Sequence, residues 1–280
     1  MEGSVVHRTG FPQGFLPEVP RVFKILPFMG LGTLSQPSEQ EIRLIRLGIV
    51  VAMTAEARSL VQKPILSGDL MHLSEGTVIQ LSGTGPQKAG EAGKNLLGHG
   101  ATALLSWGSA GGLVSTLSPG GLVLPGKVIG ADQSSYTTDP PWRGRLLDRL
   151  KGSLDLHQGS LAESVTALKG PAEKKVLFER TGAIAVDMES GALAKVAQEA
   201  GVPFMAVRAI ADPADMTIPQ SSLRAVDEFG ELSLLKLLSG LIRHPAELFD
   251  LIRLGRNFRA AQVTLSKVAH LAGSQLLIPQ

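Results

Sequence analysis

Three carboxylic acids and two glycine-rich segments of this chain each follow a short apolar run that is typical of a β-strand. They are Glu56, Glu189 and Asp212, together with Gly83-Thr84-Gly85 and Gly108-Ser109-Ala110-Gly111-Gly112. In open α/β sheets, ligands bind beyond the carboxyl ends of the strands, where loops and helix N-termini converge. We therefore predict that these side chains and open backbone segments share one edge of a sheet and form a ligand site.

Each of these features also has a purely structural explanation. A glycine-rich turn often exists only because glycine adopts positive φ at little cost. Asp187 would serve as a helix N-cap, with Glu189 favoured in the first turn by the helix dipole. Asp212 would begin an Asp-Pro turn. The coincidence of three carboxylates and two open loops on one edge favours the site.

The elements that would position these residues alternate between strand-like and helix-like segments. Strands are predicted at 46–53, 77–82, 103–106, 121–130, 183–186 and 203–210, and helices at 54–60, 87–97 and 190–200. Gly201 and Pro203 end the last of these helices. This alternation predicts an α/β fold of three layers, α/β/α, in which helices cover both faces of a central sheet.

The C-terminal quarter has a different pattern, because two long helices are predicted, at 221–242 and 245–277. Apolar or small residues recur along one side of the second helix, at positions 248, 251, 252, 255, 258, 261 and 265. Residues 241–280 carry five basic residues and two acids: Arg243, Arg253, Arg256, Arg259 and Lys267 against Glu247 and Asp250. Two alternatives stay open: the helix packs on the sheet or on a second subunit, or it presents a basic amphipathic surface to a membrane or a lipid-like substrate.

The chain divides into three parts. Residues 1–45 are rich in Pro and Gly and lack a sustained period, so we predict a leader that wraps on the surface or is disordered. We expect residues 46–230 to form the α/β domain and residues 231–280 to form a helical extension packed on it. Prolines interrupt every apolar run of residues 1–30, which argues against a signal peptide. The uncharged stretch 95–126 holds eight glycines and two prolines, so it predicts buried strands and turns and not a membrane span.

Composition narrows the class of protein further. The chain has 280 residues, 44% of them hydrophobic, which is enough for a substantial core. Its 27 basic and 25 acidic residues give a net charge of +2, so no polyanionic partner such as nucleic acid is required. The absence of cysteine excludes disulfides, thiolate metal sites and thiol catalysis. An aromatic content of 4% argues against a base-stacking platform for nucleic acid.

Several common catalytic templates do not fit. Gly83-Thr84-Gly85 does not extend to the dinucleotide-binding pattern Gly-x-Gly-x-x-Gly, because Lys88 occupies the third glycine position. The sequence also contains no Walker A motif, no Gly-x-Ser-x-Gly elbow and no His-Glu-x-x-His helix. The six histidines are scattered, so no metal site is predicted.

Four segments carry a specific resemblance: Leu47–Glu56, Ser109–Leu113, Val186–Ser190 and Arg208–Asp215. In order and spacing they resemble the nucleoside phosphorylase/nucleosidase superfamily over about residues 46–230, and its methylthioadenosine/S-adenosylhomocysteine nucleosidases most of all. The tail segments Arg243–Leu248 and Leu254–Ala261 resemble the hopanoid-associated phosphorylases, which are thought to remove adenine from adenosylhopane. The resemblance implies a mixed central sheet of the nucleoside phosphorylase type, with extra C-terminal helices.

The resemblance also implies roles for individual residues in cleaving an adenine–ribose bond. Asp212 would be the general acid that protonates purine N7, and Glu56 would orient or activate the attacking water. Glu189 would accept hydrogen bonds from the ribose hydroxyls, and Met188 would pack against the sugar. The remaining implied substrate contacts are Ser109, Gly111, Gly112 and Val165.

This sequence departs from the family at three places. Ala211 stands where relatives often have Ser before the catalytic Asp, and Thr54 and Ala55 replace frequent acidic residues. Relatives stack the purine on a Phe before Val186, but residues 150–177 hold no aromatic residue. We therefore expect either a different substrate or a wall formed by Trp107 or Tyr136.

Two alternatives remain for the co-substrate, which is water or inorganic phosphate; no other cofactor is expected. Glu56 favours hydrolysis, because its charge would repel a phosphate dianion. A phosphate cradle of Arg58, Thr84 and Gly85, with Lys88 nearby, stays open as the phosphorolytic alternative. A purine nucleoside phosphorylase, a general methylthioadenosine/S-adenosylhomocysteine nucleosidase and a non-catalytic nucleoside- or lipid-binding module are the alternative functions.

The expected partner is a small or lipid-linked adenosine substrate, and no nucleic acid. Because relatives are commonly dimers, the resemblance implies a homodimer. We expect a cytoplasmic protein, with peripheral membrane contact through the C-terminal helices as an open alternative.

Overall fold

A computed structural model describes residues 46–61, 63, 68–219, 229 and 247–273. Within these ranges the strands are β1 Leu47–Val51, β2 Leu70–Ser74, β3 Thr77–Leu81, β4 Ala103–Gly112, β5 Leu122–Val123, β6 Lys127–Ile129, β7 Ser135–Thr137, β8 Leu156–His157, β9 Ser160–Glu163, β10 Ala185–Asp187 and β11 Phe204–Asp212. The helices are α2 Thr54–Ala57, α3 Pro86–Gly98, α4 Pro140–Leu150, α5 Pro171–Thr181, α6 Ser190–Ala200 and α9 Leu248–Ala272.

All of these strands belong to one mixed sheet built around the long strand β4. Its main order is β2-β3-β1-β4-β10-β9-β6-β7, while β11 pairs with both β4 and β5, and β5 pairs with β8. β4 lies parallel to β1 and β11 but antiparallel to β10. The predicted α/β fold with a mixed central sheet is therefore confirmed.

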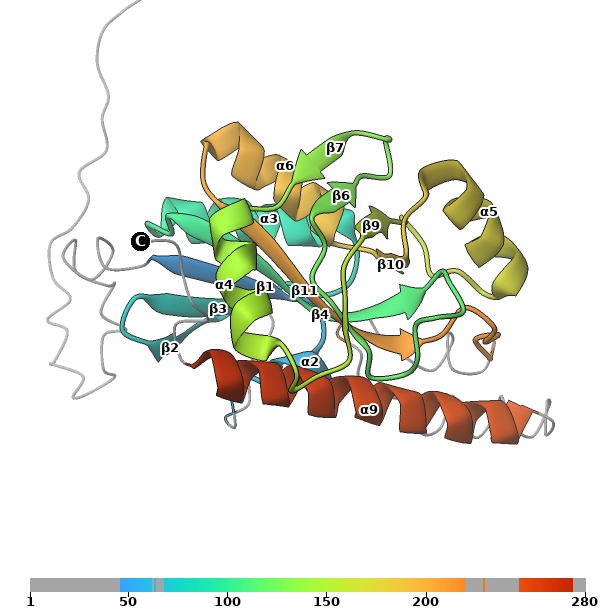
Figure 1. Cartoon of the computed structure of the whole chain (residues 1–280). Helices are drawn as coiled ribbons and strands as arrows, with labels where there is room; N and C mark the ends of the chain where they lie inside the picture. Colours follow the sequence, from blue (N-terminus) through green and yellow to red (C-terminus); the bar gives the residue numbers. More distant parts are fainter. Residues whose placement is uncertain (1–45, 62, 64–67, 220–228, 230–246, 274–280) are drawn as a thin grey trace, which may run out of the picture. The chain divides into compact units, whose positions relative to one another are not determined.

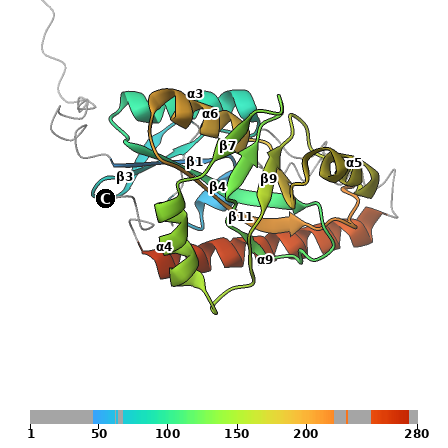
Figure 2. The ribbon, with the colours of Figure 1, turned by 45° about the horizontal axis from the view of Figure 1, so that its top comes forward.

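Helices cover both faces of the sheet (Figures 1 and 2). Helices α3 and α6 lie on one face, and α4 and α9 lie on the other. Side chains of β1 alternate between the two cores: Leu47, Ile49 and Val51 face α4 and α9, whereas Val50 faces α3 and α6. Because β1 is buried on both faces, it is a continuous apolar run and does not alternate with polar residues.

Local sequence explains where several helices begin and end. Asp139 caps α4 by accepting a hydrogen bond from the Trp142 backbone N–H at 2.7 Å. Proline occupies the first position of α3, α4 and α5, where a missing N–H costs nothing. Gly201 ends α6 in the left-handed conformation, with φ of 67°, as predicted for this helix.

Three sequence predictions differ from the observed elements. The segment Gly108–Gly112 is not an open loop, because β10 and β11 pair with it and extend β4 to Gly112. The run 121–130 is two short strands, β5 and β6, separated at Pro125. Asp187 is the last residue of β10, and the N-cap of α6 is Glu189.

The other long-range predictions have mixed outcomes. The helix predicted at 245–277 is α9, which ends at Ala272 and packs on the sheet through its second half, with Ala261, Leu265 and Val268 buried. The apolar residues of its first turns, Leu248 and Ile252, are exposed. The leader at 1–45 and almost all of the helix predicted at 221–242 lie outside the described residues.

Candidate active site at the edge of β4

The candidate site lies where β4 changes its neighbour on one side. β1 pairs with β4 up to Trp107, and β10 begins to pair only at Gly111. The side chain of Glu56 fills this interval: its Oε1 accepts hydrogen bonds from the Ser109 backbone N–H and from Ser109 Oγ, both at 2.7 Å. A change of strand neighbour is where α/β sheets commonly leave room for a ligand.

Gly108 makes the position of Glu56 sterically feasible. A Cβ atom at Gly108 would lie 2.8–2.9 Å from the carboxylate atoms of Glu56, closer than real Cβ contacts allow. Glu56 is only 2% exposed, and its Oε2 lies 3.3 Å from the Met53 backbone nitrogen. The glycine therefore serves a close approach between a strand and a buried carboxylate, and not a turn.

Glu189 connects the start of α6 to the start of α3. Its Oε1 accepts a hydrogen bond from the Gly85 backbone N–H at 2.9 Å. Gly85 precedes α3 and has φ of 105°, a conformation that favours glycine. Glu189 is buried, so the loop at 83–85 and the Asp187–Glu189 segment form one joined part of the site.

A buried ion pair lies behind these groups. Arg208 Nε donates to Asp187 Oδ2 at 2.7 Å, and the guanidinium also donates to the hydroxyls of Ser106 and Ser190. Arg208 and Asp187 are 2% and 6% exposed. The network joins β4, β10, α6 and β11 directly beneath the candidate site, and satisfied buried networks of this kind hold their members rigidly.

Asp212 has an ion-pair partner from another helix. Lys174 Nζ of α5 lies 2.8 Å from Asp212 Oδ1, and it also donates to the backbone carbonyls of Pro213 at 2.7 Å and Met216 at 3.2 Å. The Lys174 side chain is 1% exposed and that of Asp212 is 13% exposed. Asp212 is paired in register with Gly111, and a Cβ at Gly111 would lie 3.5 Å from Asp212 Oδ2.

The electrostatics of the three carboxyls favour protonation. Burial raises the pKa of Glu56, although the hydrogen bonds from Ser109 and the charge of Arg208 oppose this rise. Burial also raises the pKa of Glu189 to about 8, with the charges of Asp187 and Glu56 adding to the effect. The pKa of Asp212 is raised by burial, with Lys174 as the main opposing influence. Perturbed carboxyl groups of this kind are typical of sites that transfer protons.

The predicted carboxylates thus flank one short stretch of β4. Ser109 binds Glu56, Gly111 lies against Asp212, and the charge of Glu56 reaches Glu189. Ser109, Gly111 and Asp212 are only partly buried, in contrast to the core around them.

The remaining predicted substrate contacts differ in their burial and in whether they lie near the three carboxylates. Met188 is half-buried next to Glu189, and its backbone N–H lies 3.2 Å from Glu189 Oε2. Gly112 is buried within the sheet, where Ala185 pairs with it. Val165 follows β9 and is 60% exposed; no described contact joins it to the three carboxylates.

The residues of the predicted phosphate cradle differ in burial and lie on different elements. Thr84 and Gly85 are half-buried beside Glu189, whose carboxylate takes the Gly85 N–H. Arg58 is exposed at the C-terminal end of α2. A phosphate at this loop would therefore compete with Glu189 for a backbone donor.

Three contributors were missed by the sequence reasoning. Nothing in the sequence marks Lys174, because a Lys-Lys pair in a polar helix is usually exposed. Arg208 begins the segment Arg208–Asp215 that carries the resemblance, so its position is a signal that the sequence does contain. Phe229 lies at the same edge: its carbonyl accepts the Thr54 N–H at 3.1 Å, and Lys88 Nζ lies 5.5 Å from its ring centre.

The two residues expected as an aromatic wall, Trp107 and Tyr136, are both buried. Trp107 is 1% exposed in the core beneath α4 and α9, and its Nε1 donates to Ser59 Oγ. Tyr136 is packed in the opposite core. Among the described residues, no group of three or more His, Asp or Glu is arranged to hold a metal ion. Within the same ranges, no helix combines the length and the apolar character needed to cross a membrane.

Comparisons with known proteins agree with this architecture. Solved structures with the same fold include 5′-methylthioadenosine/S-adenosylhomocysteine nucleosidase of Helicobacter pylori, with a TM-score of 0.61 and 18% identity over 81% of this chain and 97% of that one. Futalosine hydrolase of the same organism has a TM-score of 0.61 and 18% identity over 83% and 97% of the two chains. The nucleosidase of Streptococcus pneumoniae has a TM-score of 0.58 and 20% identity over 80% and 98%.

A family model matches more than half of the chain and includes all three carboxylates of the candidate site. The match runs over residues 46–239, from the first residue before β1 to beyond Asp212. The chain therefore belongs to the phosphorylase superfamily.

Proposed function

We propose that this protein cleaves the N-glycosidic bond of an adenosine-type nucleoside and releases adenine. The observation that carries the proposal is that Glu56 and Asp212 lie on either side of one short stretch of β4, residues 108–111, and that Glu189 is near enough to Glu56 for their charges to interact. A purine is a poor leaving group unless it is protonated, and the sugar must accept a nucleophile as the bond breaks. Two carboxyl groups on either side of one strand edge can serve these two needs.

The proposed roles follow from each environment. Asp212, with a raised pKa, donates a proton to purine N7 as the C1′–N9 electron pair moves to the base. Glu56 accepts a proton from the water that bonds to C1′, and its two hydrogen bonds from Ser109 fix its orientation. Glu189 accepts hydrogen bonds from the ribose hydroxyls, with Met188 beside the sugar. We also propose that the ring of Phe229, whose centre lies 5.5 Å from Lys88 Nζ, adds an apolar surface beside these groups.

We propose hydrolysis in preference to phosphorolysis. A phosphate cradle needs free backbone N–H groups and a nearby guanidinium. Here the Gly85 N–H is bound by Glu189, and Arg58 is exposed. Glu56 in the carboxylate form, which is the form that accepts a proton from water, would also repel a phosphate dianion. Water fits this environment better than a dianion does.

For the substrate we propose a lipid-linked adenosine, with adenosylhopane of hopanoid synthesis as the specific candidate. The support is the resemblance of the tail segments and the exposed apolar residues at the start of α9. We also propose a cytoplasmic homodimer that makes peripheral contact with a membrane through this tail.

The test is product analysis with purified protein on methylthioadenosine and on adenosylhopane, each with and without phosphate. The proposal predicts adenine and a ribose that keeps its 5′ substituent, formed at rates that do not depend on phosphate, with adenosylhopane preferred. A 1-phosphate of the same 5′-substituted ribose, formed at a rate that follows phosphate, would show phosphorolysis. Tight binding of both compounds without release of adenine would favour the binding-module alternative.

A further inference from the structure

The exposed side of α9 carries an unusual number of apolar residues. Seven large hydrophobic residues of the described ranges are exposed, and four of them lie on this helix. Their exposed fractions are 43% for Leu248, 80% for Phe249, 53% for Ile252 and 47% for Val263. At 100° per residue, all four fall on one side, opposite to the buried residues Ala261, Leu265 and Val268. The helix is therefore apolar on both its inner and its outer side.

The outer side also carries positive charge. Arg256, Arg259 and Lys267 are exposed and share this side of α9 with the four apolar residues. Arg253 lies on its flank, where it pairs with Asp215 at 2.9 Å. Asp250 is two residues from Leu248 and Ile252, so it does not face them. We call Leu248, Phe249, Ile252, Arg256, Arg259, Val263 and Lys267 the outer stripe.

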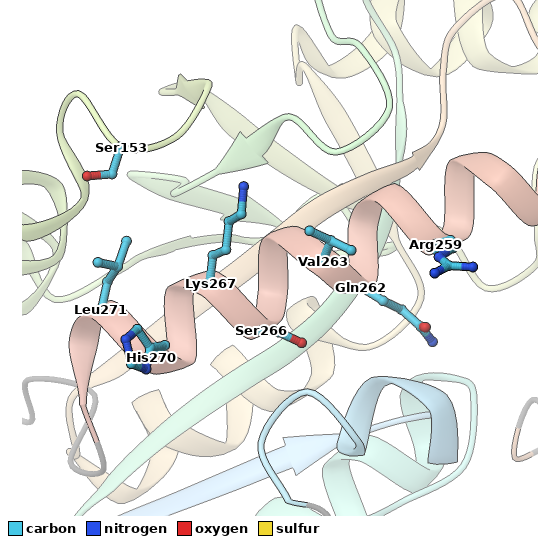
Figure 3. A pocket seen from close by; sticks show the side chains of 8 residues that line it. All are labelled: Ser153, Arg259, Gln262, Val263, Ser266, Lys267, His270 and Leu271. Carbon is cyan, nitrogen blue, oxygen red and sulfur yellow. The ribbon is translucent and has the colours of Figure 1, made fainter.

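The surface beside the stripe is hollowed and basic. A hollow of about 600 Å³ is lined by Ser153, Arg259, Val263, Lys267 and neighbouring residues of α9, and Figure 3 shows Lys267 extending toward the loop that carries Ser153. An adjoining hollow adds Arg256 and one acid, Asp155. Asp155 is 3.1 Å from His157 Nε2, so it faces an imidazole as well as the cations.

We propose that the outer stripe is a docking surface for the anionic headgroups and upper acyl region of a lipid bilayer. Cations interleaved with exposed apolar side chains on one helix side are the pattern of interfacial helices. A second copy of the chain fits less well, because a two-fold interface would place three cations against the same three cations. A nucleic acid would use the cations but not the exposed aliphatic residues.

Helix α9, which carries the stripe, contacts the segment that follows Asp212. Asp215 and Met216, which closely follow Asp212, contact Arg253 and Asn257 of α9. Figure 1 shows the first turns of α9 at the end of the sheet where β4 and β11 finish. A molecule docked through the stripe would thus hold the site edge near the lipid surface, where a lipid-linked nucleoside would be presented. Only this last consequence rests on the proposed function.

The experiment is vesicle co-sedimentation of the full chain, without substrate, so that it is independent of catalysis. Vesicles of phosphatidylcholine alone are compared with vesicles that contain phosphatidylglycerol, at low and high salt. The variants are Arg256→Glu/Arg259→Glu and Phe249→Asp/Ile252→Asp. The matched control is Lys94→Glu/Lys195→Glu, which makes the same charge change on exposed positions of α3 and α6, on the opposite face of the sheet.

The proposal predicts binding to the anionic vesicles that weakens with salt, and a loss of about tenfold or more in each stripe variant but not in the control. Equal binding by the stripe variants, or none by the unmodified protein at low salt, would overturn it. Light scattering of the same samples tests the competing occupant: a dimer that dissociates in Phe249→Asp/Ile252→Asp would assign the stripe to self-association. Because no substrate is present, failure here leaves the proposed reaction standing.

Discussion

Two opposing influences act on the pKa of Asp212. Burial favours its protonated form, as a general acid requires, while the ammonium of Lys174 at 2.8 Å favours the carboxylate that remains after proton donation. A carboxyl group balanced in this way can both carry the proton and release it, which is the property that departure of a purine demands.

Asp212→Asn keeps the size of the side chain but removes the acidic proton. We expect kcat for adenine release to fall by about 10²–10⁴-fold, the scale of general acid catalysis. Circular dichroism should show an unchanged fold. Turnover near that of the unmodified protein would remove Asp212 from the mechanism.

Lys174→Met should move the alkaline limb of the pH–rate profile to higher pH. Activity is lost where Asp212 deprotonates, and removing the cation removes the main influence that lowers its pKa. The other charges facing Asp212, Asp215 and Arg253, are unchanged in this variant. The control is Lys175→Met on the same helix, at an exposed position.

The alternative outcome for Lys174 is equally measurable. If Lys174 served only to satisfy the carbonyls of Pro213 and Met216, Lys174→Met would lower stability by about 1–3 kcal/mol and lower kcat at every pH, with the limb unmoved. Rates should be compared well below the unfolding temperature of each variant.

Glu189 makes the stability of the fold depend on pH. Its pKa rises from a reference of 4.5 to about 8 in the folded chain, so between these values the folded state holds a proton that the unfolded state releases. Stability contributed by Glu189 is therefore lost as pH rises through this window. Urea unfolding at pH 5 and pH 9 should show Glu189→Gln gaining stability relative to the unmodified protein at the higher pH; a constant difference would contradict the raised pKa.

At the scale of elements, β4 is the organising strand of the site. It keeps β11 along one side and exchanges β1 for β10 on the other, so residues 108–110 have a free edge there that Glu56 occupies. Small residues suit this stretch, since Gly108 and Gly111 leave space for the carboxylates of Glu56 and Asp212. The same residues have low strand propensity, which is why the sequence predicted a loop.

Gly108→Ala tests this packing. The added Cβ would lie within 2.9 Å of the Glu56 carboxylate, so the carboxylate must leave its bonds to Ser109. We expect activity to fall by about 10²-fold or more, together with a loss of about 1–3 kcal/mol in the free energy of unfolding. Gly144→Ala in α4 meets nothing within 4 Å. It should keep activity and gain up to about 1 kcal/mol.

At the scale of the whole molecule, α9 has two parts with different roles. Its second half completes the core, and its first half carries exposed apolar and basic residues next to the segment that follows Asp212. The protein would thus bring its catalytic edge to a lipid-linked substrate without needing a membrane span.

Substrate presentation gives a test at this scale. Arg256→Glu/Arg259→Glu should slow adenine release from a lipid-linked adenosine embedded in anionic vesicles by about tenfold, because docking is weakened. Release from soluble methylthioadenosine should be unchanged, since neither arginine belongs to the catalytic group. Equal slowing on both substrates would indicate damage to the site and not to docking.

The layers of the fold and the edge that carries the site were predictable, because buried strands such as β1 are apolar runs followed by distinctive polar residues. Contacts between distant segments were not. Lys174 and Asp212 are 38 residues apart, and nothing local to α5 distinguishes a lysine that will be buried from its exposed neighbour. The extension of β4 depends on pairing with β10 and β11, and the exposure of Leu248 and Ile252 depends on where the sheet ends. These features depend on contacts between distant segments, which the hydrophobic periodicity of the sequence does not predict.

The most direct test of the central claim is a crystal structure of the protein with a C-nucleoside analogue of adenosine, whose base–sugar bond cannot be hydrolysed. The account predicts the base within hydrogen-bond reach of Asp212 at N7, the ribose hydroxyls on Glu189, and a water between Glu56 and C1′, with heavy-atom distances of about 2.6–3.2 Å for the hydrogen bonds. An analogue bound away from β4, or bound there with its sugar out of reach of Glu189 and Glu56, would contradict it.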